Sequence, residues 1–215
     1  MAPRGGRRPS RGLFITFEGG EGSGKSTQAA LLARRLEAAG YAATLTREPA
    51  GTEVGRLAWE GIARGGLDPY TELFLFLAAR SDHTSHVIAP SLEAGGIVVC
   101  DRFADSTVAY QGYARGLDPR LLQRLNRLAT RGLRPDVIFL LDLPVKEGLA
   151  RQGRAGNDHD AIGRETVAFH ERVRRGYLAL AGAEPRRWSV LDGLRPLDEL
   201  AEEVWRRVEP FLARR

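Results

Sequence analysis

The chain has 215 residues, which is enough for one domain but too short for two full ones. Its hydrophobic fraction of 43% and charged fraction of 27% are ordinary for globular proteins and exclude a disordered chain. No apolar run approaches the roughly 20 residues that span a bilayer. Cys100 is the only cysteine, which excludes an intrachain disulfide and a cysteine-based zinc site. We therefore expect a soluble, cytoplasmic protein with no membrane contact.

The formal net charge of +5 is compatible with nucleic-acid binding. However, Lys25 and Lys146 are the only lysines among 32 basic residues, and genome composition explains this arginine bias better than a binding surface does. We expect no nucleic-acid partner.

Residues 1–11 mix arginine with glycine, proline and serine and lack the apolar core of a signal peptide. The sequence therefore predicts a disordered basic tail at 1–11 and a single domain at 12–215.

Strand and helix patterns alternate along that domain. Short β-rich runs lie at residues 13–17, 43–46, 97–100, 137–141 and 188–191. Helical patterns lie at residues 25–39, 73–92, 117–128, 166–181 and 197–212. The run at 97–100 is continuously apolar, as is typical of a strand buried on both faces. The alternation predicts an α/β fold with a five-stranded parallel sheet and helices on both faces.

The first motif that carries chemistry lies between the first strand and the first helix. Residues 19–26 read Gly-Gly-Glu-Gly-Ser-Gly-Lys-Ser and satisfy the pattern G-x-x-x-x-G-K-[ST]. In such a P-loop, glycines let backbone N–H groups close around phosphates, Lys25 reaches the β- and γ-phosphates, and Ser26 binds Mg²⁺. The residues expected to bind ATP are Gly19, Gly20, Glu21, Gly22, Ser23, Gly24, Lys25, Ser26 and Thr27.

A P-loop indicates a nucleotide and leaves the reaction open. GTPases carry an Asn-Lys-x-Asp motif, which this chain cannot form because its lysines stand only at 25 and 146. Motor proteins and helicases are normally longer and carry more motifs. The sequence therefore favours a small kinase, which requires a second pocket for the phosphate acceptor.

Further motifs follow the P-loop along the chain. They are Thr46-Arg47-Glu48-Pro49 with Gly51-Thr52, Phe76-Leu77-Ala78-Ala79-Arg80, and Asp101-Arg102-Phe103 with Ser106, Ala109, Tyr110, Gln111 and Gly112. Together with residues 17–28, they resemble the thymidylate kinase family in order and spacing. Ala50 departs from that pattern, because the family usually has glycine there. The resemblance extends from about residue 13 to the C-terminus.

This resemblance implies a P-loop kinase that phosphorylates dTMP to dTDP with ATP, a step towards dTTP. It also implies Mg²⁺ as the cofactor and a homodimer. Two alternatives stay open. One is a kinase for another pyrimidine nucleoside monophosphate, UMP or CMP. The other is an arginine-rich, nucleic-acid-binding ATPase, whose affinity for nucleic acid would fall steeply with salt.

Several residues receive substrate roles through the resemblance. Phe76 and Arg80 are four residues apart and share one helix face. The resemblance places Phe76 on the pyrimidine ring and Arg80 at a base carbonyl, although Phe76 could also be a simple core residue. Arg102 is expected to bind the acceptor phosphate bidentately, with Arg47 as a second phosphate contact. The resemblance also places Tyr110 and Gln111 along the sugar and base and Glu21 at the sugar 3′-hydroxyl and phosphate region. Ser106 is a further expected substrate-binding residue.

Two aspartates follow apolar strands and compete for a role near the metal. By resemblance, Asp101 lies close to Mg²⁺ and its waters and is the preferred candidate. Asp142 is the alternative, because it also ends an apolar strand, although it could simply cap the next helix.

Phosphoryl transfer also needs positive charge on the transferred group, often supplied by an arginine. Some family members place this arginine in the P-loop, where this chain has Gly22. We therefore expect a lid over about residues 151–163 in which Arg151 and Arg154 are catalytic. The lid departs from the family at Ala161, where arginine is usual, so Arg164 is the reserve candidate.

Overall fold

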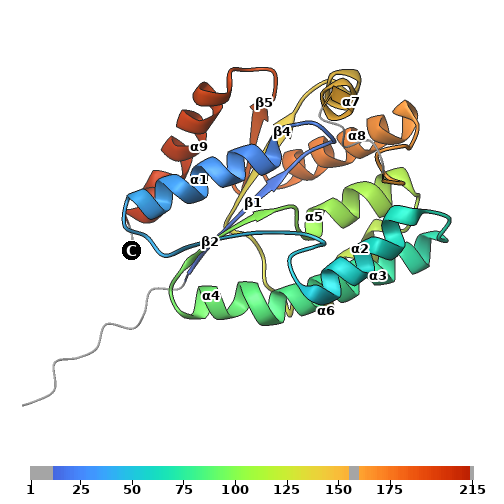
Figure 1. The fold of residues 1–215 in the computed structure, drawn as a ribbon, viewed down its shortest axis with the longest axis horizontal. Coiled ribbons are helices and arrows are strands. Elements are labelled where there is room, and N and C mark those ends of the chain that lie inside the picture. The colour runs from blue at the N-terminus through green and yellow to red at the C-terminus, as the bar shows by residue number, and fades with distance from the viewer. Residues whose placement is uncertain (1–11, 155–159, 214–215) are drawn as a thin grey trace, which may run out of the picture.

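The computed structural model describes residues 12–154 and 160–213 (Figure 1), so the tail expected at residues 1–11 lies outside the described residues. The strands are β1 (Leu13–Glu18), β2 (Ala43–Arg47), β3 (Ile97–Asp101), β4 (Val137–Asp142) and β5 (Trp188–Asp192). They form one parallel sheet in the order β2-β3-β1-β4-β5. The predicted five-stranded parallel sheet is confirmed, with each strand within about one residue of its expected bounds.

Helices connect the strands. Those before β3 are α1 (Lys25–Ala38), α2 (Glu53–Arg64), α3 (Pro69–His83), the π-helical segment η1 (Thr84–Ile88) and α4 (Ala89–Glu93). Those between β3 and β4 are α5 (Ala104–Thr107), the π-helical segment η2 (Val108–Ala114) and α6 (Pro119–Ala129). The remaining helices are α7 (Val145–Arg154), α8 (Val167–Ala183) and α9 (Leu197–Leu212).

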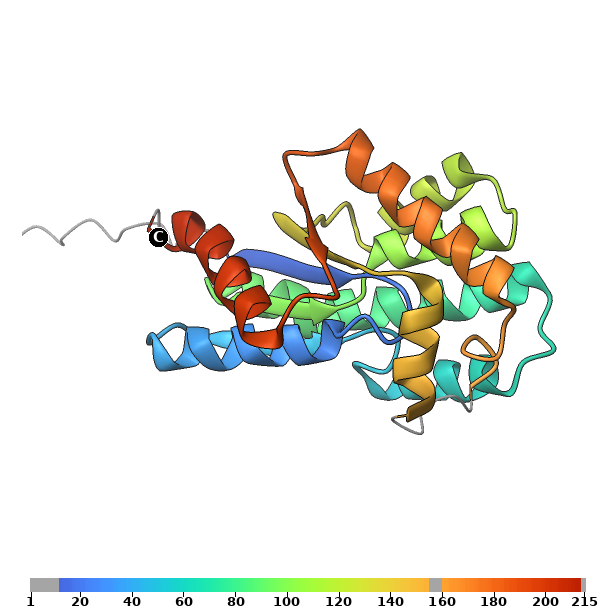
Figure 2. The same ribbon diagram turned by 90° about the horizontal axis from the view of Figure 1, so that it is seen from above.

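Both faces of the sheet are buried under helices. Helices α1 and α9 cover one face, and helices including α4 and α8 cover the other (Figures 1 and 2). Along β1, Ile15 and Phe17 pack towards α1 and α9, whereas Phe14 packs towards α4. This alternation is the period-two geometry of a strand. It explains why the central strands β1, β3 and β4 are buried along nearly their whole length and mostly apolar, whereas the edge strands β2 and β5 are only partly buried.

The strand register brings polar residues together at the carboxyl ends of the central strands. Asp101 at the end of β3 is level with Phe17 of β1 on one side and Arg47 of β2 on the other. In open α/β sheets, ligands bind outside the carboxyl ends of the strands. The residues that follow β1, β2 and β3 therefore face a common site.

The helix predictions need three corrections. The expected helix at 73–92 starts at Pro69 and contains the π-helical segment η1. Helix α2 and the helical turns at 104–114 were not expected, because Gly55 and Gly112 lower helix propensity there. These helices form because packing between elements overrides the low propensity. Residues 151–154 form the last turn of α7, so the expected lid begins on a helix; residues 155–159 lie outside the described part of the chain.

Candidate active site

The phosphate loop joins β1 to α1 in a conformation that depends on glycine. Gly19, Gly22 and Gly24 all have positive φ angles, of 145°, 65° and 90°. At Gly22 there is also no space for a side chain, because a Cβ would overlap the carbonyl oxygen of Gly148 in α7. A glycine-dependent loop that leads from a strand directly into the N-terminus of a helix is the kind of structure that binds phosphate through backbone N–H groups.

Lys25 lies beneath this loop and is buried. Its ammonium group donates to the carbonyl oxygen of Gly20 at 2.7 Å and to Ser23 Oγ at 3.3 Å. Burial, followed by the nearby charge of Arg102, lowers the pKa of Lys25 to about 8. An incoming anion would relieve both effects, because it would compensate the buried positive charge.

Ser26 and Asp101 form a pair of oxygen groups beside the loop. The Ser26 hydroxyl donates a hydrogen bond to Asp101 Oδ2. The other carboxylate oxygen, Oδ1, is buried and has no hydrogen-bond partner among the described residues. A hydroxyl and a carboxylate with an unpartnered oxygen are the kind of ligands that Mg²⁺ prefers, so these residues fit such an ion.

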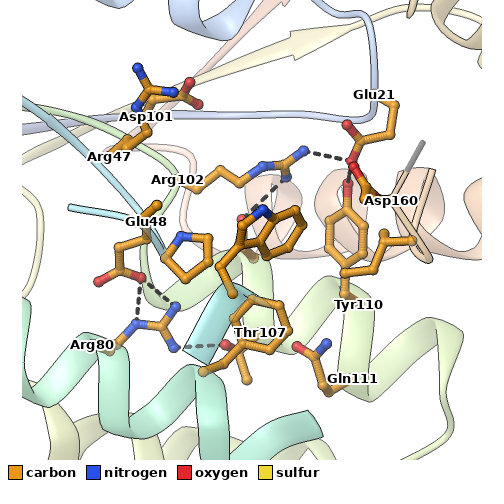
Figure 3. A pocket seen from close by; sticks show the side chains of 16 residues that line it. Glu21, Arg47, Glu48, Arg80, Asp101, Arg102, Thr107, Tyr110, Gln111 and Asp160 are labelled. Atoms are coloured by element: carbon orange, nitrogen blue, oxygen red, sulfur yellow. Dashed lines mark hydrogen bonds and ion pairs between the residues drawn. The ribbon is translucent and has the colours of Figure 1, made fainter. Parts of the chain in front are cut away.

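Arg102 connects the phosphate loop to the opposite side of the site (Figure 3). Its Nη2 donates to Glu21 Oε1 at 2.7 Å, and the same oxygen accepts from the Tyr110 hydroxyl at 2.7 Å. The guanidinium also lies over the Tyr110 ring, 5.1 Å from its centre. Burial raises the pKa of Glu21, but the charges of Arg102 and Lys25 outweigh this effect and lower it to about 2. Glu21 is therefore a fixed anion that orients Arg102.

A cavity of about 260 Å³ opens from this point (Figure 3). Glu21, Arg47, Asp101 and Arg102 lie on one side of the cavity, with Asp160 beside Glu21, and the ion pair of Glu48 and Arg80 lies on the other side (Figure 3). The remaining lining residues are Pro49, Ala50, Trp59, Phe76, Ser106, Thr107, Tyr110, Gln111 and Ile162. Cationic groups on one side and aromatic rings along the wall suit a ligand that has both a phosphate and a planar base.

Comparison with known proteins decides the family. Residues 17–204 match the family model described as thymidylate kinase. The chain belongs to the thymidylate kinase family. It is therefore a kinase that phosphorylates dTMP. This decides against both alternatives, a kinase for UMP or CMP and a nucleic-acid-binding ATPase.

Individual thymidylate kinases support this assignment over most of the chain. The enzyme of Desulfovibrio desulfuricans is 48% identical, with 94% of this chain and 98% of the relative covered. That of Thermomicrobium roseum is 50% identical, with 94% and 96% covered. The crystal structure of thymidylate kinase from Ehrlichia chaffeensis aligns with a TM-score of 0.76 at 36% identity, covering 93% of this chain and 99% of that one.

Within this thymidylate kinase, Arg80 is held more tightly than its expected role requires. It is 1% exposed, and its guanidinium donates to Glu48 Oε2, Thr107 Oγ1 and other protein acceptors. The other acceptors are Asn126 Oδ1 and the carbonyl oxygen of Phe103. These bonds engage all five of its N–H donors. Donation to a base carbonyl would therefore require the exchange of one existing bond.

Gln111 and Ser106 are also engaged by neighbouring side chains. Gln111 lines the cavity, and its Nε2 donates to Glu72 at 2.9 Å. The Ser106 hydroxyl donates to Glu18 Oε2 at 2.6 Å. Phe76 lies half-buried in the cavity wall and packs against a core cluster, so the geometry is compatible with both stacking and core packing.

The structure distinguishes the two candidate aspartates. Asp142 accepts two hydrogen bonds from Arg174, at 2.7 and 2.9 Å. Both of its oxygens therefore have a partner, whereas Oδ1 of Asp101 has none among the described residues. This arrangement favours Asp101 as the metal-site residue and assigns Asp142 to an ion pair with α8.

The expected lid arginines occupy different environments. Arg151 donates to the carbonyl oxygen of Gly193 at 2.9 Å. Arg154 is exposed at the end of α7. Arg164 lines a separate pocket together with Arg64 and Arg115.

Sequence reasoning did not predict several residues that line this cavity, among them Thr107 at the end of α5. Trp59 comes from α2, which was not expected to be a helix, and Asp160 and Ile162 come from the segment after α7. No local pattern distinguishes these residues in the sequence. Their position depends on the packing of segments that are distant in the chain.

Proposed function

We propose that the chain transfers the γ-phosphate of ATP directly to the phosphate of dTMP, without a covalent intermediate. The observation that carries this proposal is the continuity of the phosphate loop with the acceptor cavity through Glu21 and Arg102. The acceptor phosphate is already ionised near neutral pH, so no general base is required. Catalysis then depends on positioning and charge stabilisation.

The proposed roles follow the charge distribution of the cavity. Arg47 and Arg102 bind the acceptor phosphate, since they are the cations on the same side of the cavity as Glu21. Glu21 and Tyr110 contact the sugar, and Phe76 stacks on the base. Ser106, Gln111 and Arg80 complete the acceptor site, with Arg80 acting through an exchanged hydrogen bond. Lys25 stabilises the transferred phosphate together with the backbone N–H groups of residues 19–27.

We propose Ser26 and Asp101 as the protein ligands of Mg²⁺ or of its waters. The support is the unpartnered, buried Oδ1 of Asp101 beside the Ser26 hydroxyl. Bound Mg²⁺ would neutralise part of the charge on the ATP phosphates. The chain itself holds the Ser26 hydroxyl and the Asp101 carboxylate together beside the start of α1.

We further propose that this kinase is of the bacterial type with a catalytic arginine in the lid. Because Gly22 cannot carry a side chain beside Gly148, the phosphate loop cannot supply that charge. Arg151 and Arg154 are the candidates, and Arg164 is the reserve. The domain proposal is a single kinase domain at residues 12–215 with the lid over about 151–163.

A homodimer is proposed from the family and from exposed apolar side chains. Helix α3 packs against α2 and α6. These helices expose Leu57, Phe74 and Leu128, which are 63%, 58% and 77% accessible. Burial of such groups drives association. Phe74→Asp should therefore shift the protein from dimer to monomer in sedimentation velocity, with the protein remaining folded.

Localisation is proposed to be cytoplasmic. In the part of the chain that the structure describes, we find no helix of the length and apolarity needed to cross a membrane.

The enzymatic proposal is tested by measuring ADP formation with a panel of nucleoside monophosphates. We expect the highest kcat/KM with dTMP, and complete loss of turnover when Mg²⁺ is chelated. Asp101→Asn should raise the Mg²⁺ concentration required for half-maximal rate while leaving dTMP binding intact. Equal kcat/KM for UMP or CMP would contradict the dTMP preference, and turnover without a divalent cation would contradict the metal site.

A further inference from the structure

Glu18 is a buried carboxylate that the mechanism does not yet use. It is the last residue of β1 and is 0% exposed. Oε1 accepts from the backbone N–H of Phe103 at 2.8 Å. Oε2 accepts from the Ser106 hydroxyl at 2.6 Å and from the Tyr177 hydroxyl at 2.9 Å. One side chain thus connects β1 to the segment after β3, to α5 and to α8.

These contacts surround Arg102, which has an unusual backbone. Its φ angle is 71°, in the left-handed region that costs a residue with a side chain roughly 1–2 kcal/mol. The N–H of Arg102 donates to the carbonyl oxygen of Phe17 at 2.9 Å, and the next N–H donates to Glu18. Two successive residues of β1 therefore hold the backbone on both sides of the Arg102 Cα.

The same network reaches the Arg102 side chain. Its Nη1 lies 3.3 Å from the Tyr177 hydroxyl and 3.5 Å from Ser106 Oγ, which are the two hydroxyls that donate to Glu18. The two hydroxyls also lie 2.8 Å from each other, so one of them can donate to the other while the second donates to Glu18. In either arrangement each hydroxyl oxygen keeps a lone pair that can accept from Arg102. Glu18 thus determines the direction in which these hydroxyls face the guanidinium.

We infer that Glu18 is a positioning residue that holds Arg102 in the orientation required to bind the dTMP phosphate. The inference rests on the proposed role of Arg102 in acceptor binding. A purely structural carboxylate would affect folding and would leave the energetic contribution of Arg102 unchanged. A positioning carboxylate loses its effect on dTMP binding when Arg102 is removed.

A double-mutant cycle separates these two roles. Glu18→Gln keeps the size of the side chain but directs N–H donors at the Ser106 and Tyr177 hydroxyls, which must then compete for acceptors. We expect Glu18→Gln to weaken dTMP binding about tenfold, measured by calorimetry on the full chain without ATP at pH 8, above the pKa of about 7 of this carboxyl. In an Arg102→Ala background, the same change should have an effect of less than twofold. ATP affinity should change less than twofold throughout.

Thr16→Val is the matched control. Thr16 lies two residues before Glu18 on the same face of β1 and is equally buried. Its hydroxyl has no hydrogen-bond partner in the described parts of the chain. This substitution should leave dTMP affinity unchanged.

Additive effects of Glu18→Gln and Arg102→Ala would overturn the inference, as would unchanged dTMP affinity in Glu18→Gln. If Glu18→Gln does not fold, Tyr177→Phe removes one of the hydrogen bonds with little change in volume. It should give a smaller loss of dTMP affinity that also disappears in the Arg102→Ala background, and additivity there would overturn the inference equally. If Arg102→Ala alone retains normal dTMP affinity, the proposed role of Arg102 fails first.

Discussion

Gly22 of the phosphate loop and Gly148 of α7 lie so close together that neither position has space for a side chain. A Cβ on Gly22 would overlap the carbonyl oxygen of Gly148, and a Cβ on Gly148 would overlap the carbonyl oxygen of Glu21. The helix that carries Arg151 and Arg154 is therefore packed directly against the phosphate loop. This contact connects the ATP site to the proposed lid.

Gly148→Ala should separate α7 from the phosphate loop. We expect kcat to fall at least about tenfold, because small misplacements of catalytic groups are costly, and the melting temperature to fall as well. Gly153→Ala is the matched control on the same helix, since a Cβ there meets no atom of the described residues within 4 Å. It should raise or maintain stability because alanine favours helix over glycine by about 1 kcal/mol. Normal kcat in Gly148→Ala would show that the contact is not needed for turnover.

Lys25→Met should abolish turnover without destabilising the free enzyme. The ammonium is buried and its pKa is lowered to about 8, so its charge is unfavourable in the absence of nucleotide. We expect kcat to fall at least about a hundredfold, as for loss of comparable charge stabilisers. The melting temperature without nucleotide should be equal or higher. Turnover within threefold of wild type would contradict the assignment of the phosphate loop.

Phe76→Ala should weaken dTMP binding by about 5- to 150-fold, since stacking of one base on an aromatic ring contributes roughly 1–3 kcal/mol. ATP affinity, measured separately by calorimetry, should not change. Leu77→Ala is the control, because Leu77 is the next residue on α3 but packs against a core cluster with Leu73 and Leu122. It should lower the melting temperature with normal dTMP affinity. The same result for Phe76→Ala would identify Phe76 as a core residue only.

Replacing both Arg151 and Arg154 with alanine should lower kcat at least about a hundredfold, within the range for an arginine supplied to phosphoryl transfer. Binding of dTMP alone should be unaffected, because Arg47 and Arg102 remain. Single variants separate the two residues, since Arg151 is bonded to Gly193 in this structure. If the double variant retains normal kcat and Arg164→Ala is inactive, the catalytic arginine is Arg164. If all three changes are silent, the lid-arginine mechanism is wrong.

Glu18 should make stability decrease as the pH rises. Burial, and then the charge of Asp105, raises the pKa of Glu18 from 4.5 to about 7. The folded state therefore binds this proton more tightly than the unfolded state does. The stabilisation of the folded state by this proton is fully present below about pH 4.5 and is lost as the pH rises through about 7. The total loss is roughly 3 kcal/mol.

Urea unfolding of wild type and Glu18→Gln between pH 5 and 8 tests this prediction. As the pH rises from 5 to 8, the unfolding free energy of wild type should fall relative to that of Glu18→Gln. Burial also raises the pKa of Asp105, to about 6, so the comparison between proteins is more informative than either curve alone. Parallel curves would show that Glu18 does not titrate in this range.

Local patterns in the sequence were sufficient to predict the sheet, the phosphate loop and the family. Strands such as Ile97–Asp101 are short apolar runs between helices, and neighbouring residues alone carry this signal. The phosphate loop was predicted equally well, because glycines at fixed spacing before Lys25 and Ser26, between a strand and a helix, are specific for phosphate binding. Phe76, Arg102 and Tyr110 were named from motifs, and the structure brings them to one cavity.

The way in which those residues are held could be learned only from the folded chain. The side-chain partners of Arg80 are Glu48, Thr107 and Asn126, which come from three separate segments and share no pattern in the sequence. The contact between Gly22 and Gly148 joins residues more than a hundred positions apart, so their spacing carries no signal. A helix after Asp142 was anticipated only as one that Asp142 could cap, and its bounds were not predicted, because its two glycines weaken local propensity whereas packing on the phosphate loop stabilises it. Side-chain chemistry can be recognised locally, but the packing that orients it depends on contacts between distant segments.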